Sequence, residues 1–395
     1  MIYLDNHATT PCDPRVLNAM TPYFLTAFGN AGSVNHRYGA EAKDAVETAR
    51  RQVAELIAAA PREIVFTSGA TESNNLAIKG IVERSLAVPH GERRPHVVSV
   101  ATEHPAVLDP LEALQRRGVA VSLLPVKPHG DSRAGEIDLD RLEQAITPQT
   151  VLVSAMLANN EIGVIQPLSE IAEICRRRHV PLHTDATQAV GRIPVNVNEL
   201  GVDLLSLSAH KMYGPKGVGA LYIRRRRPAL KLTPLIDGGG QERGLRSGTL
   251  NVPGIAGLGA AAKLAAEEMS DEAPRIAELK MRLFETLIGT IRGLELIGPA
   301  LEVPGLRLPG NLNLHFPALD GESLMLAAPE IAVSSGAACA STKEEPSHVL
   351  RALGLTPDQS RCCLRFGVGR MNTAEETDQA AEMLAAAAAR LGRFA

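Results

Sequence analysis

A regular alternation of short apolar segments and helical segments runs from about residue 63 to residue 223. We expect strands at residues 64–67, 97–100, 120–124, 151–155, 181–184, 204–208 and 219–223. Helical spacing covers residues 72–86, 106–117, 139–146 and 168–178 between them. This alternation predicts an α/β fold with a mainly parallel central sheet that is covered by helices.

The pattern changes after Gly254. A helical region rich in Ala, Leu and Glu follows, with an expected interruption near Pro274, then short strands at residues 311–316 and 331–334 and a final helix over residues 373–390. A chain of 395 residues is also longer than one hydrophobic core usually serves. We therefore predict a large domain over residues 15–255 and a smaller α/β domain formed by residues 1–14 and 256–395.

Charge and cysteine content exclude several classes of protein. The formal net charge is -3, which argues against a nucleic-acid-binding protein, and the basic run at residues 224–227 is typical of a solvated turn after a strand. The start of the chain lacks the basic and apolar regions of a signal peptide, and no apolar run approaches the ~18 residues of a membrane span. The five cysteines have no disulfide-like spacing, so we expect a cytoplasmic protein with reduced thiols.

Three polar residues follow the expected strands at the edge where ligands bind in such sheets. Lys211 comes after residues 204–208, and a buried lysine with a lowered pKa can form a Schiff base with an aldehyde cofactor. Asp185 ends the preceding strand, where an acid can pair with a protonated pyridine nitrogen. His104 follows another strand and could stack on such a ring. Each residue alone could be structural, but their joint position favours a cofactor site.

The turn after residues 64–67 is a candidate phosphate site. Gly69 leads into a helix that we expect to start at about Ala70 and Thr71. The free N–H groups and the positive end of the helix dipole at such a turn attract phosphate, and the Thr71 hydroxyl could add a donor.

Five ordered blocks carry a resemblance to a known family. They lie at residues 68–73, 102–104, 159–163, 185–188 and 208–211, and read SGATES, TEH, NNEIG, DATQ and SAHK. This set closely resembles the cysteine desulfurases, which belong to the class V aminotransferase-like enzymes of pyridoxal-phosphate fold type I. The resemblance runs nearly end to end, from residues 3–10 to residues 365–370.

The resemblance implies pyridoxal 5'-phosphate as the cofactor, a Schiff base on Lys211, a contact from Asp185 to the pyridinium nitrogen, and stacking by His104. It also implies that Asn160 and Gln188 bind the ring oxygen and its surroundings. The phosphate would be held by Ala70, Thr71, Ser208 and His210. The block at residues 238–249 further implies an obligate homodimer, in which Thr249 of the partner subunit completes the phosphate site.

The sulfur chemistry is expected at Cys339. Residues 334–346 are small and polar, with no strand or helix pattern, so a thiolate there could take sulfur in the site and then move to a partner. Cys175, by contrast, lies in an apolar-periodic helix and is expected in the core. Arg365 is predicted to bind the substrate α-carboxylate through two parallel hydrogen bonds, near Asn160, with Arg370 as the weaker candidate.

These assignments together predict an enzyme that converts L-cysteine to L-alanine and keeps the sulfur as a persulfide on Cys339. An acceptor or scaffold protein would then receive it, for iron–sulfur cluster assembly or for thiolation. The loop around Cys339 resembles the cluster-assembly branch, although Ala209 stands where the family usually has glycine. A selenocysteine lyase or an aminotransferase on the same fold is the alternative. A non-catalytic protein that kept the fold would be expected to have lost Lys211 or Asp185, and both are present.

Overall fold

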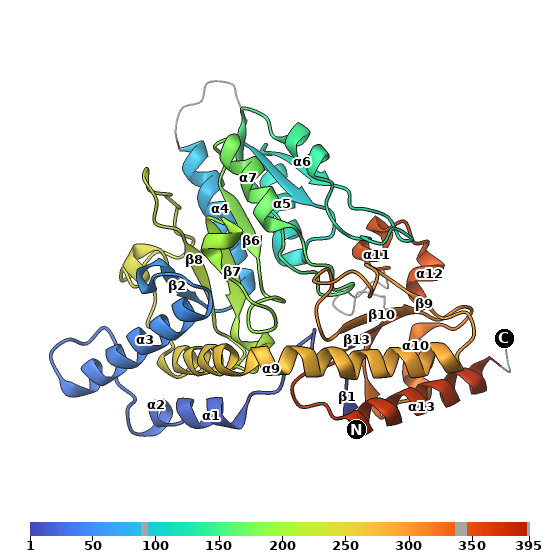
Figure 1. Ribbon diagram of the computed structural model, residues 1–395. Coiled ribbons are helices and arrows are strands. Elements are labelled where there is room, and N and C mark those ends of the chain that lie inside the picture. Colours follow the sequence, from blue (N-terminus) through green and yellow to red (C-terminus); the bar gives the residue numbers. More distant parts are fainter. Residues whose placement is uncertain (88–93, 336–345, 393–395) are drawn as a thin grey trace.

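The computed structural model of the chain describes residues 1–87, 94–335 and 346–392 (Figure 1). The helices are α1 (Pro14–Met20), α2 (Pro22–Leu25), α3 (Arg37–Leu56), α4 (Ala70–Leu86), α5 (Pro105–Gln115), α6 (Leu139–Ala145), α7 (Leu168–Arg177), α8 (Val197–Leu200), α9 (Val252–Thr290), α10 (Gly321–Ala327), α11 (His348–Ala352), α12 (Pro357–Arg361) and α13 (Ala374–Leu391). The strands are β1 (Ile2–Tyr3), β2 (Ile64–Thr67), β3 (His96–Val100), β4 (Ala120–Leu124), β5 (Thr150–Ser154), β6 (Leu182–Asp185), β7 (Leu204–Ser208), β8 (Gly219–Ile223), β9 (Glu295–Leu296), β10 (Asn311–His315), β11 (Ile331–Ala332), β12 (Ser334–Ser335) and β13 (Cys363–Gly367). Among the described helices, none combines the length and apolarity needed to cross a lipid bilayer.

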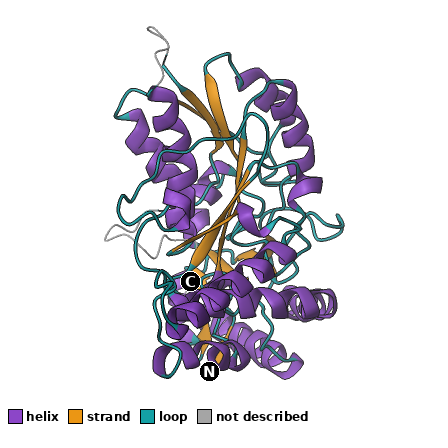
Figure 2. Cartoon of the chain, turned by 90° about the vertical axis from the view of Figure 1, so that its left-hand side faces the viewer, coloured by secondary structure: helices purple, strands orange, loops and turns teal. Residues whose placement is uncertain are grey.

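A seven-stranded sheet forms the centre of the described structure, in the order β2-β8-β7-β6-β5-β3-β4. The pairs from β4 through β7 are parallel, and β8 runs antiparallel to both of its neighbours. Helices lie on both sides of this sheet (Figure 2). The predicted α/β fold and its mainly parallel sheet are confirmed, and each predicted strand of this sheet matches to within one residue at either end.

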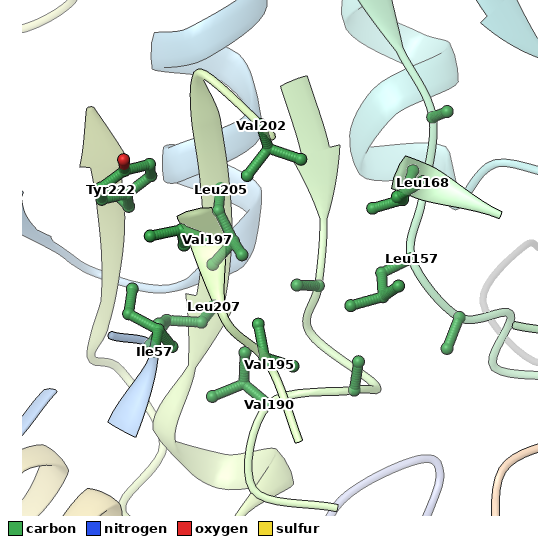
Figure 3. Close-up of a cluster of buried hydrophobic side chains, with 14 of the residues drawn as sticks. Ile57, Leu157, Leu168, Val190, Val195, Val197, Val202, Leu205, Leu207 and Tyr222 are labelled. Atoms are coloured by element: carbon green, nitrogen blue, oxygen red, sulfur yellow. The ribbon is translucent and has the colours of Figure 1, made fainter. Parts of the chain in front are cut away.

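The strands of this sheet other than the edge strand β4 are buried on both faces. In β7, Leu205 and Leu207 pack into one apolar cluster, while Leu204 packs into a second cluster on the opposite face. This is the two-residue periodicity of a strand. Figure 3 shows the first cluster, in which Val197 and Tyr222 surround the β7 side chains. Central parallel strands therefore appear in the sequence as continuous apolar runs.

A smaller assembly surrounds a third apolar cluster. It contains the antiparallel sheet β12-β13-β10-β9, the parallel pair β1-β11, and the helices α10 and α13. The long helix α9 serves both parts, because Ile255 and Leu258 pack in the first cluster and Leu283 and Leu287 pack in the third (Figure 1). The first cluster also includes Leu308 and Leu350, which belong to the predicted small domain, so the division at residues 14 and 255 remains a prediction.

Two expectations for the C-terminal half were wrong. The helix does not break near Pro274, since α9 continues through this residue, whose ring is exposed on the helix surface. Packing of α9 against α3 and α13 offsets the local cost of proline in a helix. The strand expected at residues 331–334 is divided into β11 and β12, which pair in different sheets.

Candidate active site

The start of α4 forms one end of the site. Thr67, Gly219 and Ser208 lie in register on the adjacent strands β2, β8 and β7. A Cβ on Gly219 would lie 2.7 Å from the Gly69 Cα, so glycine at this position allows the turn before α4 to come close to β7. Among the described residues, no side chain caps the first turn of α4, which begins at Ala70 as predicted. Its free N–H groups thus lie beside Ser208, as an anion site requires.

The segment at residues 238–249 is attached to this end of the site. The Glu72 carboxylate accepts hydrogen bonds from the Ser68 N–H at 2.8 Å and from the Arg246 Nε at 2.9 Å. Burial raises the pKa of Glu72, but the hydrogen bonds from Arg246 and Ser68 outweigh this effect and lower it below its usual value. Thr249, close to Arg246 in the chain, is exposed. It is therefore accessible at the surface of its own subunit.

Lys211 lies immediately after β7, in the short 3-10 turn Ala209–Lys211. Its Nζ donates to the carbonyl oxygens of His7 at 2.6 Å and Ala8 at 2.7 Å. Burial, with the cations Arg192 and Arg365 nearby, lowers the pKa of Lys211 to about 7. A large fraction of this amine is therefore neutral and nucleophilic near neutral pH.

Asp185 ends β6 and is 6% exposed. Its Oδ2 accepts a hydrogen bond from Asn74 Nδ2 of α4 at 2.7 Å, and its Oδ1 accepts from the Thr187 N–H at 2.9 Å. These contacts fix the direction of the carboxylate and stabilise its charge.

His104 caps the N-terminus of α5, with its Nδ1 accepting from the Ala106 N–H at 3.0 Å. The Nδ1 atom is thus unprotonated, and the proton of the neutral ring is on Nε2. Burial lowers the pKa of His104, although its ring surface is exposed. The capping bond leaves Nε2–H free to act on a ligand.

Gln188 is oriented by His7, a residue to which the sequence analysis assigned no role. The His7 Nδ1 lies 2.9 Å from the Gln188 Oε1, and the Gln188 Nε2 donates to the His7 carbonyl oxygen at 2.9 Å. Arg192 Nη1 also lies 3.0 Å from the His7 Nδ1, but the double contact with Gln188 favours a proton on that nitrogen. Burial, then Arg192, lowers the pKa of His7 well below its usual range, so this ring is neutral.

His210 and Arg192 are two further basic residues next to Lys211. The His210 Nδ1 lies 3.0 Å from the Thr9 hydroxyl, and burial, then Lys211, lowers the pKa of His210 to about 4. Arg192 donates to the Lys211 carbonyl oxygen at 3.2 Å. Nothing in the local sequence distinguishes Arg192, because its role depends on contacts with residues far away in the chain.

Arg365 projects from β13 toward the same region. Its Nη2 donates to the Asp5 carboxylate at 2.7 Å and the Ser334 hydroxyl at 2.8 Å, and its Nη1 donates to the Asn160 carbonyl oxygen at 3.3 Å. The Arg365 Nε is buried without a partner among the described residues. The structure therefore brings the Arg365 guanidinium to the main chain of Asn160, and a substrate-binding role for either residue remains a prediction.

Arg370, by contrast, is held by other side chains of the protein. Its Nη1 donates to Asp13 at 3.0 Å, its guanidinium lies 4.4 Å from the centre of the Tyr213 ring, and Glu272 forms a further ion pair. A side chain held in this way is not available to a substrate carboxylate.

Cys339 lies outside the described residues, but the chain on either side of residues 336–345 is fixed at the site. Ser334 contacts Arg365, as given above. On the other side, the Ser347 hydroxyl donates to Glu161 at 2.5 Å, and His348 Nε2 lies 2.7 Å from the Glu103 carbonyl oxygen. The sequence analysis did not identify the roles of Ser347 and His348. The described chain therefore ends beside Arg365 before this segment and resumes next to Glu161 and Glu103 after it.

The residues present fit pyridoxal phosphate. They provide a lysine with a low pKa, a fixed buried acid and an uncapped helix N-terminus beside Ser208. Several buried polar atoms near Lys211 and Asp185 also lack partners among the described residues: His7 Nε2, Asn74 Oδ1, Thr187 Oγ1 and Arg365 Nε. Buried polar atoms are rarely left unpaired, so this set points to a polar ligand.

Comparisons with known proteins agree with this chemistry. The family model "Aminotransferase class-V" matches residues 2–380. The chain is 49% identical to the cysteine desulfurase IscS of Rickettsia bellii (strain OSU 85-389) over 97% of this chain and 90% of the relative, and equally similar to that of Rickettsia felis (strain ATCC VR-1525 / URRWXCal2).

Two solved structures are also similar. A NifS-like protein superposes with a TM-score of 0.87 at 37% identity and covers 99% of each chain. SspA in complex with cysteine has a TM-score of 0.80 at 35% identity, and the match covers 93% of this chain and 99% of that one.

Proposed function

The chain belongs to the aminotransferase class-V family and is a pyridoxal-phosphate-dependent cysteine desulfurase, and from this premise we propose which residues carry out its reaction. L-cysteine is the substrate, L-alanine is the product, and the sulfur passes to an acceptor. The observation that carries the proposed assignment is the Lys211 amine, whose pKa is about 7 and which lies in one site with the fixed Asp185 carboxylate.

Lys211 would hold the cofactor covalently, and Asp185 would contact its ring nitrogen. Asn160 and Gln188 would bind the ring oxygen and its surroundings. Ala70, Thr71, Ser208 and His210 would hold the phosphate, with His104 against the ring. When bound, pyridoxal phosphate supplies an aldehyde that binds amines and a ring that withdraws electrons from the substrate Cα. His7 would orient Gln188 for this task, because its ring Nδ1 and its carbonyl oxygen both contact the side-chain amide of Gln188.

Arg365 would fix the substrate by its carboxylate. Two parallel hydrogen bonds from a guanidinium determine which bond of an amino acid faces the reacting groups. Asp5 and Ser334 hold one edge of this guanidinium, and the unpaired Nε marks where further contacts can form. The Lys211 amine would take the substrate Cα proton, and His104 would assist proton transfer toward the product carbon.

Cys339 would take the sulfur. Its thiolate attacks the substrate sulfur, an S–S bond forms, and the Cβ–S bond breaks with its electron pair left on carbon, which then takes up a proton. The products are alanine and a Cys339 persulfide.

The remaining parts of the proposal concern partners and location. The sulfur would go to an acceptor or scaffold protein, for iron–sulfur cluster assembly or thiolation. A homodimer in which Thr249 of the partner subunit completes the phosphate site is supported by the exposure of Thr249 and of the apolar side chains Phe24, Leu25 and Phe28. The four free cysteines of the described residues agree with a reducing, cytoplasmic location.

One assay tests the proposed roles. Purified holoenzyme with L-cysteine and a thiol reductant should release alanine and sulfide in equal amounts. Cys339→Ala should abolish sulfide release and retain the visible absorbance of the lysine-bound cofactor. Cys175→Ala is the matched control, because burial raises the pKa of this core thiol to about 12 and leaves it unreactive. Sulfide release by Cys339→Ala at the wild-type rate would contradict the assignment, and a preference for selenocysteine or for a keto-acid acceptor would indicate the related activities.

A further inference from the structure

Glu103 is a buried carboxyl group for which the mechanism above has no use. It follows β3 in the chain and is 0% exposed. Its Oε1 accepts a hydrogen bond from the Met156 N–H at 2.6 Å, while its Oε2 is buried with no partner in the described part of the chain. A carboxylate with a single donor and no cation is poorly stabilised in such a place.

The surroundings of Glu103 connect the elements of the site. Met156, which donates to Glu103, is followed by Leu157, whose N–H donates to the Asp185 carbonyl oxygen at 2.9 Å. The Glu103 carbonyl oxygen contacts His348 of α11 at 2.7 Å, and His104 is the next residue in the chain. Asp185 is the charged group that acts on the Glu103 carboxyl, whereas His348 contacts the main chain of Glu103, and no ion pair of the described residues includes Glu103.

We propose that Glu103 is a positioning residue that works as a neutral carboxylic acid, fixing the segment that carries His104 and leaving Asp185 as the single negative charge at the ring-nitrogen end of the site. This inference rests on the proposed role of Asp185. An ionised Glu103 would place a second negative charge beside Asp185 and favour protonation of one of the two. A neutral acid keeps the bond to Met156 and avoids this competition.

The electrostatics agree with the geometry. Burial raises the pKa of the Glu103 carboxyl well above its usual range, the Asp185 carboxylate raises it further, and only the Met156 N–H opposes them. The folded protein therefore keeps a proton that the unfolded chain releases above a pH of about 4.3. The free energy of unfolding must then fall as pH rises, until the pKa of the folded state is reached.

Thermal unfolding of the holoenzyme from about pH 5 to about pH 9 tests this proposal. Glu103→Gln keeps an acceptor for Met156 and carries no titratable proton. Its Tm should exceed the wild-type Tm by an amount that grows as pH rises. Glu242→Gln is the matched control, because Glu242 is also buried, at 6% exposed, but binds Arg50 at 2.7 and 2.9 Å, so the same substitution should lower the Tm throughout this range.

Infrared spectra provide a second measurement that does not depend on turnover. The wild type should show the C=O stretch of a protonated carboxylic acid near neutral pH, and Glu103→Gln should lack it. Glu103→Ala should shift the pH dependence of the visible cofactor band, and Glu103→Gln should restore it. A Tm difference that is negative or independent of pH, or the absence of this C=O stretch, would overturn the proposal. If only the cofactor assignment were wrong, the Tm difference would persist in a protein without the visible band.

Discussion

Lys211 has a low pKa because of the residues that the fold places around it. Arg192 and Arg365 come from distant parts of the chain, and both lower the pKa in addition to the larger effect of burial. Among the described residues, the Lys211 ammonium donates hydrogen bonds to the carbonyl oxygens of His7 and Ala8. A lysine in this environment reacts at a pH where exposed lysines are charged.

Cofactor-free protein should therefore react with pyridoxal phosphate in a pH-dependent way. The rate of cofactor uptake should rise through a midpoint near pH 7, since the neutral amine is the nucleophile and burial lowers the pKa of Lys211 to about 7. Stopped-flow absorbance gives this rate. Lys211→Ala is the control and should lose the visible band. A wild-type rate that is still rising steeply at pH 9 would contradict the low pKa.

Arg365→Lys should weaken substrate binding while the charge is kept. A lysine cannot form two parallel hydrogen bonds with a carboxylate, so kcat/KM for L-cysteine should fall about 10- to 100-fold, mainly through KM. Arg370→Lys is the contrasting variant. It loses the contact with the Tyr213 ring and should lower the Tm with little change in KM. Equal effects of the two variants on KM would contradict the separate roles of these arginines.

At the residue scale, chemical motifs at strand ends predicted which residues the fold brings close together, while the roles of these residues remain proposals. Lys211, Asp185 and His104 lie in one site for this reason, and Cys175 is buried as expected. The roles of His7 and Arg192 were not found. The contact between His7 and Gln188 joins residues 181 positions apart, so no local pattern could reveal it.

At the scale of elements, strands were easier to predict than breaks in helices. A buried strand such as β7 has leucines on both faces and no charged residue, and the sequence displays this directly. Pro274 has a local cost in a helix, which predicted an interruption. The cost is overcome by packing along the remainder of α9, and long-range packing is not visible in a short window of sequence.

Pro274→Ala should stabilise the protein. Alanine restores a backbone N–H within α9. Because Pro274 is exposed, removing its ring loses little buried apolar surface. The gain of up to ~3 kcal/mol is partly offset by the freedom of alanine in the unfolded chain, so we expect about 1–2 kcal/mol in denaturant unfolding. Pro253→Ala is the matched control, because Pro253 lies in the first turn of the same helix and should change stability by less than about 0.5 kcal/mol. A loss of stability in Pro274→Ala would show that proline is required there.

At the scale of the whole molecule, a group of large apolar side chains near the N-terminus is exposed on the surface of the single subunit. Leu25, Phe24 and Phe28 are 69%, 60% and 64% exposed. Exposed apolar groups of this size are typical of interfaces. The sequence predicted a homodimer only through resemblance, since these residues form no distinctive pattern.

Leu25→Glu should shift the protein from dimer to monomer in analytical ultracentrifugation. A charge at a buried interface is costly, and the monomer would also bind the cofactor more weakly if Thr249 of the partner subunit helps to hold its phosphate. Leu326→Glu is the control, since Leu326 is 81% exposed but lies on α10, away from this group. A Leu25→Glu protein that remains dimeric would place the interface elsewhere.

The helix α9 also has a consequence for unfolding. It contains 39 residues, extends for about 58 Å, and contributes side chains to apolar clusters in both parts of the molecule. Loss of one cluster would expose that half of the helix and withdraw support from the other half. Calorimetry should therefore record one heat-absorption peak, whose van't Hoff enthalpy matches the integrated heat of the whole subunit.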